Sequence, residues 1–209
     1  MPSRYLVPVR DGEAEIEVKR SRFRCTVVRV TDEDAARAVV ERLRRQHWDA
    51  RHHCSAFVLG PTAQLQRSSD DGEPAGTAGA PMLEVLRGRE VSDVVAVVTR
   101  WFGGVLLGAG GLVRAYGDAV RAGLDEVGTL TRELVIEHEL VLEHTEAGRV
   151  EGELRLRGVR VLGSAYADRV TLRLGVPQAR GDVLGPLLAE LTGGTAAPVA
   201  VGQSWVDLS

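Results

Sequence analysis

Three carboxylates, Asp70, Asp71 and Glu73, lie close together in a turn-prone stretch rich in glycine and proline. Three roles are open to such side chains. They can accept hydrogen bonds from nearby amides in Asx turns, they can pair with Arg22 or Arg100 and so brace a cleft, or they can act as general acids and bases. Acid–base catalysis in a hydrolase works beside a nucleophile, and the sequence offers no Ser/His or Cys/His arrangement of that kind. We therefore assign no catalytic residue and keep an acidic cleft as an alternative.

His52 and His53 precede Cys54 at the start of a predicted strand, and with the carboxylates they supply the donor types of a metal site. Zinc sites usually combine paired ligands at short spacing, whereas adjacent residues of a strand point to opposite faces. We expect no metal and a structural hydrogen-bonding role for one histidine. In the acidic-cleft alternative, His52 lies beside the carboxylates.

Arg100, Trp101 and Phe102 follow directly after residues 94–99, a β-branched apolar run typical of a strand buried on both faces. We expect Arg100 to be exposed where the chain leaves the core. A cation and two rings there suit a nucleic acid, with Arg100 on a phosphate and the rings stacked on a base. Trp101 and Phe102 can equally fill the core, and both interpretations stay open.

Ten of the 24 glycines lie between Gly72 and Gly117. Glycine loses the most backbone freedom on folding, so this density indicates positions that need a positive φ or a close backbone approach. Neither nucleotide-binding fingerprint is met, because the spacing does not give GxGxxG and Ala109 stands where a P-loop needs lysine. We expect no cofactor, and the glycines serve either an RNA phosphate or close packing of a helix on a strand.

Four basic residues cluster between positions 19 and 24, at a predicted bend between two strands. Charge at such an edge discourages sheet-to-sheet association, and it can also contact an anion. Lys19 and Arg22 are the candidates for anion contact. Arg114, in the helix that follows the glycines, is a third candidate.

The hydrophobic pattern predicts strands and helices in both halves of the chain. In the first half, strands are expected at 13–19, 23–30, 52–58 and 94–99, and helices at 32–43, 81–86 and 109–124. Thr31 is the expected N-cap of the first helix, and Val113 is expected on the buried face of the third.

The second half has the predicted order βαββαβ, which is the ferredoxin-like unit. Its strands are expected at 134–143, 159–166, 170–176 and 199–201, and its helices at 145–154 and 183–191. Thr145 is the expected cap of the first of these helices. Pro186 favours a late start or a kink in the second.

The chain has 209 residues and a net charge of −3. No apolar run reaches the roughly 18 residues of a membrane span, and the N-terminus lacks a signal-peptide core, so we expect a cytoplasmic protein that does not enter a membrane. Cys25 and Cys54 lie in apolar segments and are expected to be reduced and buried. The residues after position 125 are acidic overall, which disfavours contact with a polyanion there.

The segments SDDGEPAGTAGAPM, TRWFGG and LLGAGGLVRAYG, together with residues 19–23 and 50–54, closely resemble the YigZ/IMPACT family in its bacterial two-domain branch. The resemblance implies an N-terminal domain with the fold of the second domain of ribosomal protein S-five and a ferredoxin-like C-terminal domain. This pair is similar to domains four and five of elongation factor G, which touch ribosomal RNA. Eukaryotic members of the family act in translational control, by competing for the activator of a stress kinase.

We therefore predict an α+β protein of two domains, 1–127 and 128–209. The expected function is non-catalytic binding of structured RNA, the ribosome or a translation-associated protein, and the alternative is a hydrolase or other small-molecule enzyme with the acidic cleft. The oligomeric state is left open. The residues expected at the binding surface are Lys19, Arg22, His52, Asp70, Asp71, Glu73, Arg100, Trp101, Phe102, Gly103, Gly104, Gly110, Gly111 and Arg114.

Overall fold

The computed structural model describes residues 2–208, and the chain divides into two compact units, one ending at Arg132 and one spanning Glu133–Leu208. Both units contain helices and strands, which confirms the predicted α+β class with two domains. The boundary expected after residue 127 falls between the last helix of the first unit and the strand that follows it.

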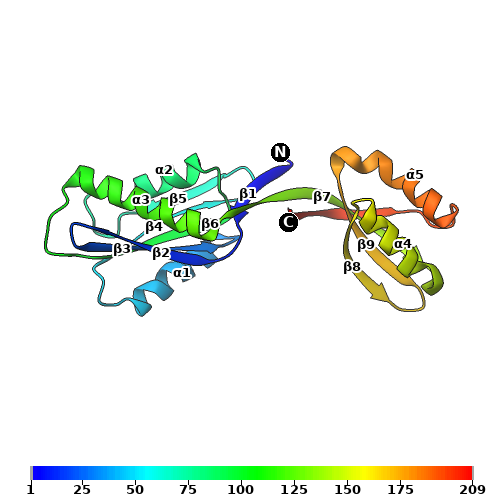
Figure 1. Ribbon diagram of the computed structural model, residues 1–209, viewed down its shortest axis with the longest axis horizontal. Helices are drawn as coiled ribbons and strands as arrows, with labels where there is room; N and C mark the ends of the chain where they lie inside the picture. Colours follow the sequence, from blue (N-terminus) through cyan, green and yellow to red (C-terminus); the bar gives the residue numbers. More distant parts are fainter. Residues whose placement is uncertain (1, 209) are drawn as a thin grey trace. The chain divides into compact units, whose positions relative to one another are not determined.

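The first unit is built on an antiparallel sheet of five strands in the order β2-β3-β6-β4-β5 (Figure 1). These strands are β2 (Gly12–Val18), β3 (Ser21–Arg29), β4 (His52–Leu59), β5 (Leu65–Ser69) and β6 (Val94–Trp101). The central strand β6 is buried from Val94 to Arg100, as its β-branched sequence predicts. A further strand, β1 (Arg4–Pro8), pairs with β7 (Thr129–Leu142).

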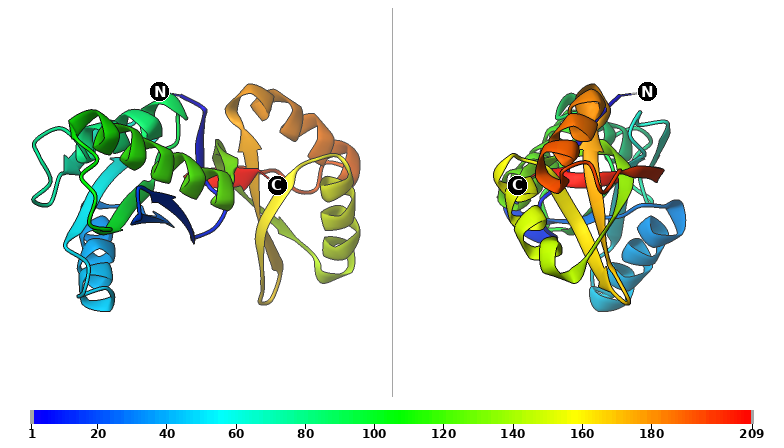
Figure 2. Two further views of the ribbon diagram at one scale, coloured as in Figure 1. Left: turned by 60° about the vertical axis from the view of Figure 1, so that its left-hand side comes forward. Right: turned by 90° about the vertical axis from the view of Figure 1, so that its right-hand side faces the viewer.

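Three helices cover this sheet, with α1 (Glu33–Gln46) on one face and α2 (Gly79–Gly88) and α3 (Ala109–Val127) on the other (Figures 1 and 2). Each face of the sheet therefore has its own core. Strand residues at alternate positions divide between the two cores, because successive side chains of a strand point to opposite faces.

Two details of these helices differ from the prediction. The N-cap of α1 is Asp32, whose Oδ1 accepts a hydrogen bond from the Ala35 amide at 2.8 Å, so the choice of Thr31 was wrong by one residue. Val113 is 39% exposed, because the buried face of α3 passes through Leu112 and Tyr116 instead.

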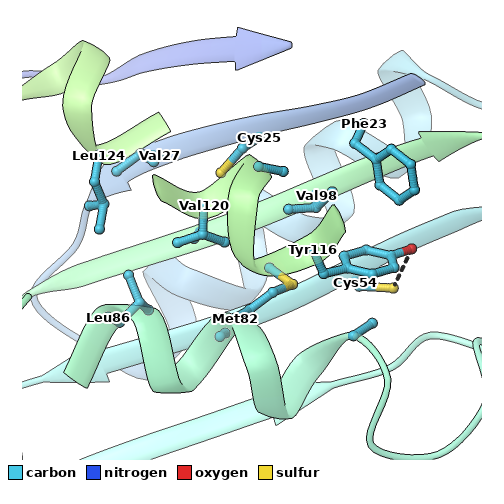
Figure 3. Close-up of a cluster of buried hydrophobic side chains, with 14 of the residues drawn as sticks. Phe23, Cys25, Val27, Cys54, Met82, Leu86, Val98, Tyr116, Val120 and Leu124 are labelled. Carbon is cyan, nitrogen blue, oxygen red and sulfur yellow. Dashed lines mark hydrogen bonds between the residues drawn. The ribbon is translucent and has the colours of Figure 1, made fainter. Parts of the chain in front are cut away.

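The larger core lies between the sheet and helices α2 and α3 (Figure 3). Phe23 of β3 and Tyr116 of α3 meet edge to face, with ring centroids 5.3 Å apart. Helix α3 approaches β3 closely at Gly123, where an added Cβ would lie 2.9 Å from the Cys25 sulfur. Cys25 and Cys54 are both buried, as predicted.

The second unit contains α4 (His144–Leu156), β8 (Arg160–Tyr166), β9 (Val170–Pro177), α5 (Gly181–Thr192) and β10 (Val199–Leu208) after β7. Its sheet order, β10-β7-β9-β8, and its element order, βαββαβ, are those of the ferredoxin-like fold. One core joins the sheet to both helices.

Two helix starts in this unit also differ from the prediction. Helix α4 begins at His144, with Glu143 at the N-cap and no capping hydrogen bond from its side chain, so Thr145 is not the cap. Pro186 lies in the middle of α5 without delaying its start, which is at Gly181.

No helix within residues 2–208 combines the length and apolar character that a membrane crossing needs.

Candidate functional site

Asp70 anchors the start of helix α2. Its carboxylate accepts hydrogen bonds from the amides of Gly76 at 2.8 Å, Ala78 at 3.0 Å and Gly79 at 2.8 Å. Burial raises the pKa of this carboxyl, but the three amide bonds outweigh burial and hold its pKa below the usual value. This is the local amide-binding role that the sequence offered for one of the three carboxylates.

Asp71 joins the acidic loop to β4 and α1. Its carboxylate accepts a hydrogen bond from the His53 amide at 2.6 Å and pairs with Arg44 at 2.6 Å. Its backbone carbonyl lies 2.8 Å from Nδ1 of His52. His52 therefore has a structural hydrogen-bonding role. Its neighbour His53 is buried, and this burial lowers the pKa of the His53 imidazole.

Glu73 and Arg100 form a buried ion pair on the α3 side of the sheet. The Arg100 Nη1–Glu73 Oε1 distance is 2.5 Å, and the side chains are only 7% and 4% exposed. Tyr116 also donates its hydroxyl to Glu73 Oε1 at 2.8 Å, while the Cys54 sulfur lies 3.3 Å from that hydroxyl (Figure 3). Burial raises the pKa of Tyr116 and raises that of Cys54 to about 12, so both groups stay protonated at neutral pH.

The expectation that Arg100 is exposed is wrong. Strand β6 remains inside the fold through this residue, and the even-numbered positions of β6 face helix α3. All three carboxylates of the acidic loop thus have partners within the first unit. Among residues 2–208, no group of three or more His, Cys, Asp or Glu side chains is placed to hold a metal ion.

Trp101 points to the opposite face of the same strand, and four neighbours hold its indole. The guanidinium carbon of Arg22 lies 4.6 Å from the ring centroid and that of Arg24 lies 5.5 Å away, both within cation–π range. The indole N–H donates to Asp49 at 2.9 Å, and the His47 ring packs edge-on at 5.4 Å. Trp101 is only partly buried, so it is not a core plug.

The sequence interpretation missed Trp48, which is 83% exposed. In the chain it lies just beyond the end of α1, between His47 and Asp49, which are two of the residues that contact Trp101. A signal for it does exist in the sequence. The helical repeat of buried positions in α1 ends at Leu43, so a tryptophan after that repeat has no place in the core.

The β2–β3 hairpin places two more cations near this end of the sheet. Lys19 and Arg20 form its two-residue turn with φ of 48° and 65°, values that residues other than glycine seldom adopt. Gly103 makes room for the turn, because a Cβ there would lie 2.0 Å from the Arg20 backbone. Its amide also donates to the Ser21 hydroxyl at 3.1 Å.

The loop after Gly103 is exposed. Phe102 is 47% exposed and Leu106 is 82% exposed. Gly104 has a φ of 84°, and nothing lies within 4 Å of the place where its Cβ would be. The glycine content of this segment therefore has two separate causes, a close approach at Gly103 and a positive φ at Gly104.

Gly110, Gly111 and Arg114 belong to the first turns of α3, away from Trp101. Arg114 lines a groove of about 630 Å³ between α2 and α3, together with Arg89 and Arg121. Two of these cations already have carboxylate partners in α3. Arg89 pairs with Asp125, and Arg121 pairs with Asp118. The residues predicted to form one binding surface are therefore separated in the structure. Some belong to the acidic loop, some lie at or near this groove, and some lie around Trp101.

We call one set the basic–aromatic surface: it consists of Lys19, Arg20, Arg22, Arg24, Trp48 and Trp101. Glu15 partly neutralises it, at 2.9 Å from Arg24 and 3.8 Å from Arg22. Within the described residues, Lys19 and Arg20 have no ion-pair partner. This surface combines stacking area with available positive charge, which is what binding of a single-stranded nucleic acid requires.

Comparison with known proteins gives matches along most of the chain. The Impact N-terminal domain matches residues 19–124, and the domain of unknown function DUF1949 matches residues 140–195. IMPACT family member YvyE of Bacillus subtilis (strain 168) is 41% identical over 91% of this chain and 88% of its own length, and IMPACT family member YigZ of Escherichia coli (strain K12) is 38% identical over 95% and 98%. A solved structure titled as that of a hypothetical protein is 37% identical, with a TM-score of 0.65, and covers 96% of this chain and 98% of its own.

Proposed function

The chain belongs to the IMPACT family, and from this premise we propose that it is a non-catalytic binding protein that acts on structured RNA in the context of translation. A cytoplasmic location goes with this proposal. The binding surface that we assign is the basic–aromatic surface of the first unit.

One observation carries the proposal: Trp101 lies against the guanidinium groups of Arg22 and Arg24, while Trp48, whose chain neighbours His47 and Asp49 both contact Trp101, leaves most of its indole uncovered. An exposed tryptophan keeps a large apolar area in water, and such area is a common feature of binding sites. Bases stack on indole rings in proteins that bind single-stranded RNA, and arginines nearby contact the phosphates. The unpaired loop of a structured RNA offers both features.

The arrangement of the acidic loop favours this function over the acidic-cleft enzyme. Asp70 binds amides of its own loop and of the first residue of α2, Asp71 binds Arg44 and Glu73 binds Arg100. A general acid or base must reach the proton of a substrate, and these carboxylates are already directed at groups of the protein itself. No observation in the described part of the chain specifically favours the enzyme.

The proposal is tested by fluorescence anisotropy with a labelled RNA hairpin that has a single-stranded loop, measured across a salt series. With three to four cations in contact, the logarithm of the binding constant is expected to fall with the logarithm of salt concentration at a slope of about −2 to −3. Trp48→Ala is expected to weaken binding by a factor of about 5 or more, because loss of stacking on one base costs about 1–3 kcal/mol.

Leu156→Ala is the matched control, because Leu156 is 82% exposed and lies in the second unit. It is expected to bind as the wild type does. Binding that is independent of salt, or equal in the Trp48→Ala variant and the wild type, would contradict the proposal.

A further inference from the structure

The second unit contains a cavity of about 490 Å³ that the proposed function does not use. It lies between the turn after α4, the end of β9 and helix α5. Its wall is mainly apolar and includes Val159, Val176, Leu184 and Leu187. This volume is in the range of sites that bind small molecules.

Four charged groups lie at the rim of this cavity, and two of them neutralise each other. Arg157 and Glu190 form a two-pronged ion pair, with hydrogen bonds of 3.0 and 2.8 Å. The other two, Arg180 and Asp182, have no hydrogen-bonding or ion-pair partner for their side chains within residues 2–208. The rim therefore presents one cation and one anion that remain available, two positions apart in the chain.

Pro186 adds a backbone acceptor at the same place. Proline has no N–H, so the carbonyl of Asp182, four residues earlier in α5, lacks its usual helical partner. Pro186 also lines the cavity. A proline inside a helix costs about 3 kcal/mol, so this residue does not serve the stability of α5.

We propose that this cavity binds the zwitterion of a free apolar amino acid. The carboxylate of the ligand pairs with Arg180, and its ammonium group donates to the carboxylate and the carbonyl of Asp182. Its side chain packs against Val176, Leu184 and Leu187. A fatty acid would make no contact through Asp182 and an alkylamine none through Arg180, so a ligand that carries both charges can form ion pairs with both groups of the site. The inference is independent of RNA binding, because it concerns a different surface.

Isothermal titration calorimetry of the full chain with L-leucine tests the site. Two matched probes each lack one charge: 4-methylpentanoate has no ammonium group, and leucinamide has no carboxylate. We expect saturable binding of L-leucine and at least a tenfold weaker binding of each probe. Because Arg180 and Asp182 are exposed, Arg180→Gln and Asp182→Asn should fold normally, and each should weaken L-leucine binding about tenfold.

A cavity-filling variant, Leu187→Trp, should abolish binding, and Leu156→Trp is its control because Leu156 does not line the cavity. If Leu187→Trp does not fold, the two charge variants carry the test alone. The proposal is overturned if neither L-leucine nor L-phenylalanine binds saturably, if 4-methylpentanoate or leucinamide binds as tightly as L-leucine, or if the charge variants bind as the wild type does.

Discussion

Arg100 and Trp101 are neighbours in the chain, but they lie on opposite faces of strand β6 and have different roles. Arg100 is buried against Glu73 on the α3 side, whereas Trp101 is partly exposed and lies against Arg22 and Arg24 on the α1 side. The alternation of a strand shows that the two point apart. It does not show which one faces solvent, because a cation and an aromatic ring at a strand end suit either face.

The buried pair gives the first prediction. Arg100→Met is expected to lower the free energy of unfolding by about 3 kcal/mol or more, because it leaves the Glu73 carboxylate buried with the Tyr116 hydroxyl as its only remaining side-chain partner within residues 2–208. Urea denaturation measures the change. The double variant Arg100→Met/Glu73→Gln should recover part of the loss, since no charge then stays buried.

A stable Arg100→Met variant that loses RNA binding would contradict the structural role. It would instead support the direct contact with a partner that the sequence suggested for Arg100.

Asp70 gives a prediction of pH dependence. Its pKa is lower in the folded protein than the value of about 3.9 expected for an unfolded chain. Its contribution to stability is therefore present above about pH 4 and is lost as the pH falls through the folded pKa. Asp70→Asn should flatten the fall of the unfolding free energy below about pH 4, whereas the exposed Asp118→Asn should leave that slope unchanged.

At the scale of elements, the β2–β3 hairpin combines strain with charge. Type I′ turns favour Asn-Gly, because both central residues have positive φ, yet here they are Lys19 and Arg20. Residues held in such conformations cost about 1–3 kcal/mol each, and they cluster at functional sites. The two strained residues of the hairpin are therefore both cations, and their conformation lowers the stability of the fold.

The double substitution Lys19→Asn/Arg20→Gly should raise the free energy of unfolding by about 1–2 kcal/mol and weaken RNA binding. Glu90→Gly is the matched control, because Glu90 also has a positive φ, of 54°, and lies outside the basic–aromatic surface. Unfolding and anisotropy titrations should show stabilisation in both variants and weaker RNA binding only in the first. Equal RNA binding by both variants would show that the hairpin does not take part in RNA binding.

Element prediction succeeds where a pattern is unambiguous. The β-branched run of β6 and the βαββαβ order of the second unit are both read directly from the sequence. Strand β5 is not predicted, because Leu65–Ser69 is mostly polar and lies at the edge of the sheet. Neither face of the strand is buried, so its sequence does not alternate between apolar and polar residues. The predicted cap of α1 is wrong by one residue, since Thr31 and Asp32 are both good N-caps and only the three-dimensional register selects between them.

For the whole molecule, the sequence gives the region of the candidate site but not its composition. The prediction that the acidic loop, the glycines and the Arg100 segment belong to one unit agrees with the structure. Three-dimensional packing then turns the acidic loop inward and brings the segment after α1, which carries Trp48 between His47 and Asp49, into contact with Trp101. No local pattern joins residues 53 positions apart, because that proximity depends on how α1 packs on the sheet.

The chain's own tryptophans offer the most direct test of the central claim, that the basic–aromatic surface binds RNA. There are three, Trp48 and Trp101 in this surface and Trp205 in the second unit. Each gives one indole N–H signal in a ¹⁵N-correlated NMR spectrum, assigned by substituting each tryptophan in turn with phenylalanine. On titration with an RNA hairpin, we predict that the signals of Trp48 and Trp101 shift saturably while that of Trp205 stays in place. A shift of Trp205 with unmoved signals of Trp48 and Trp101 would contradict the account.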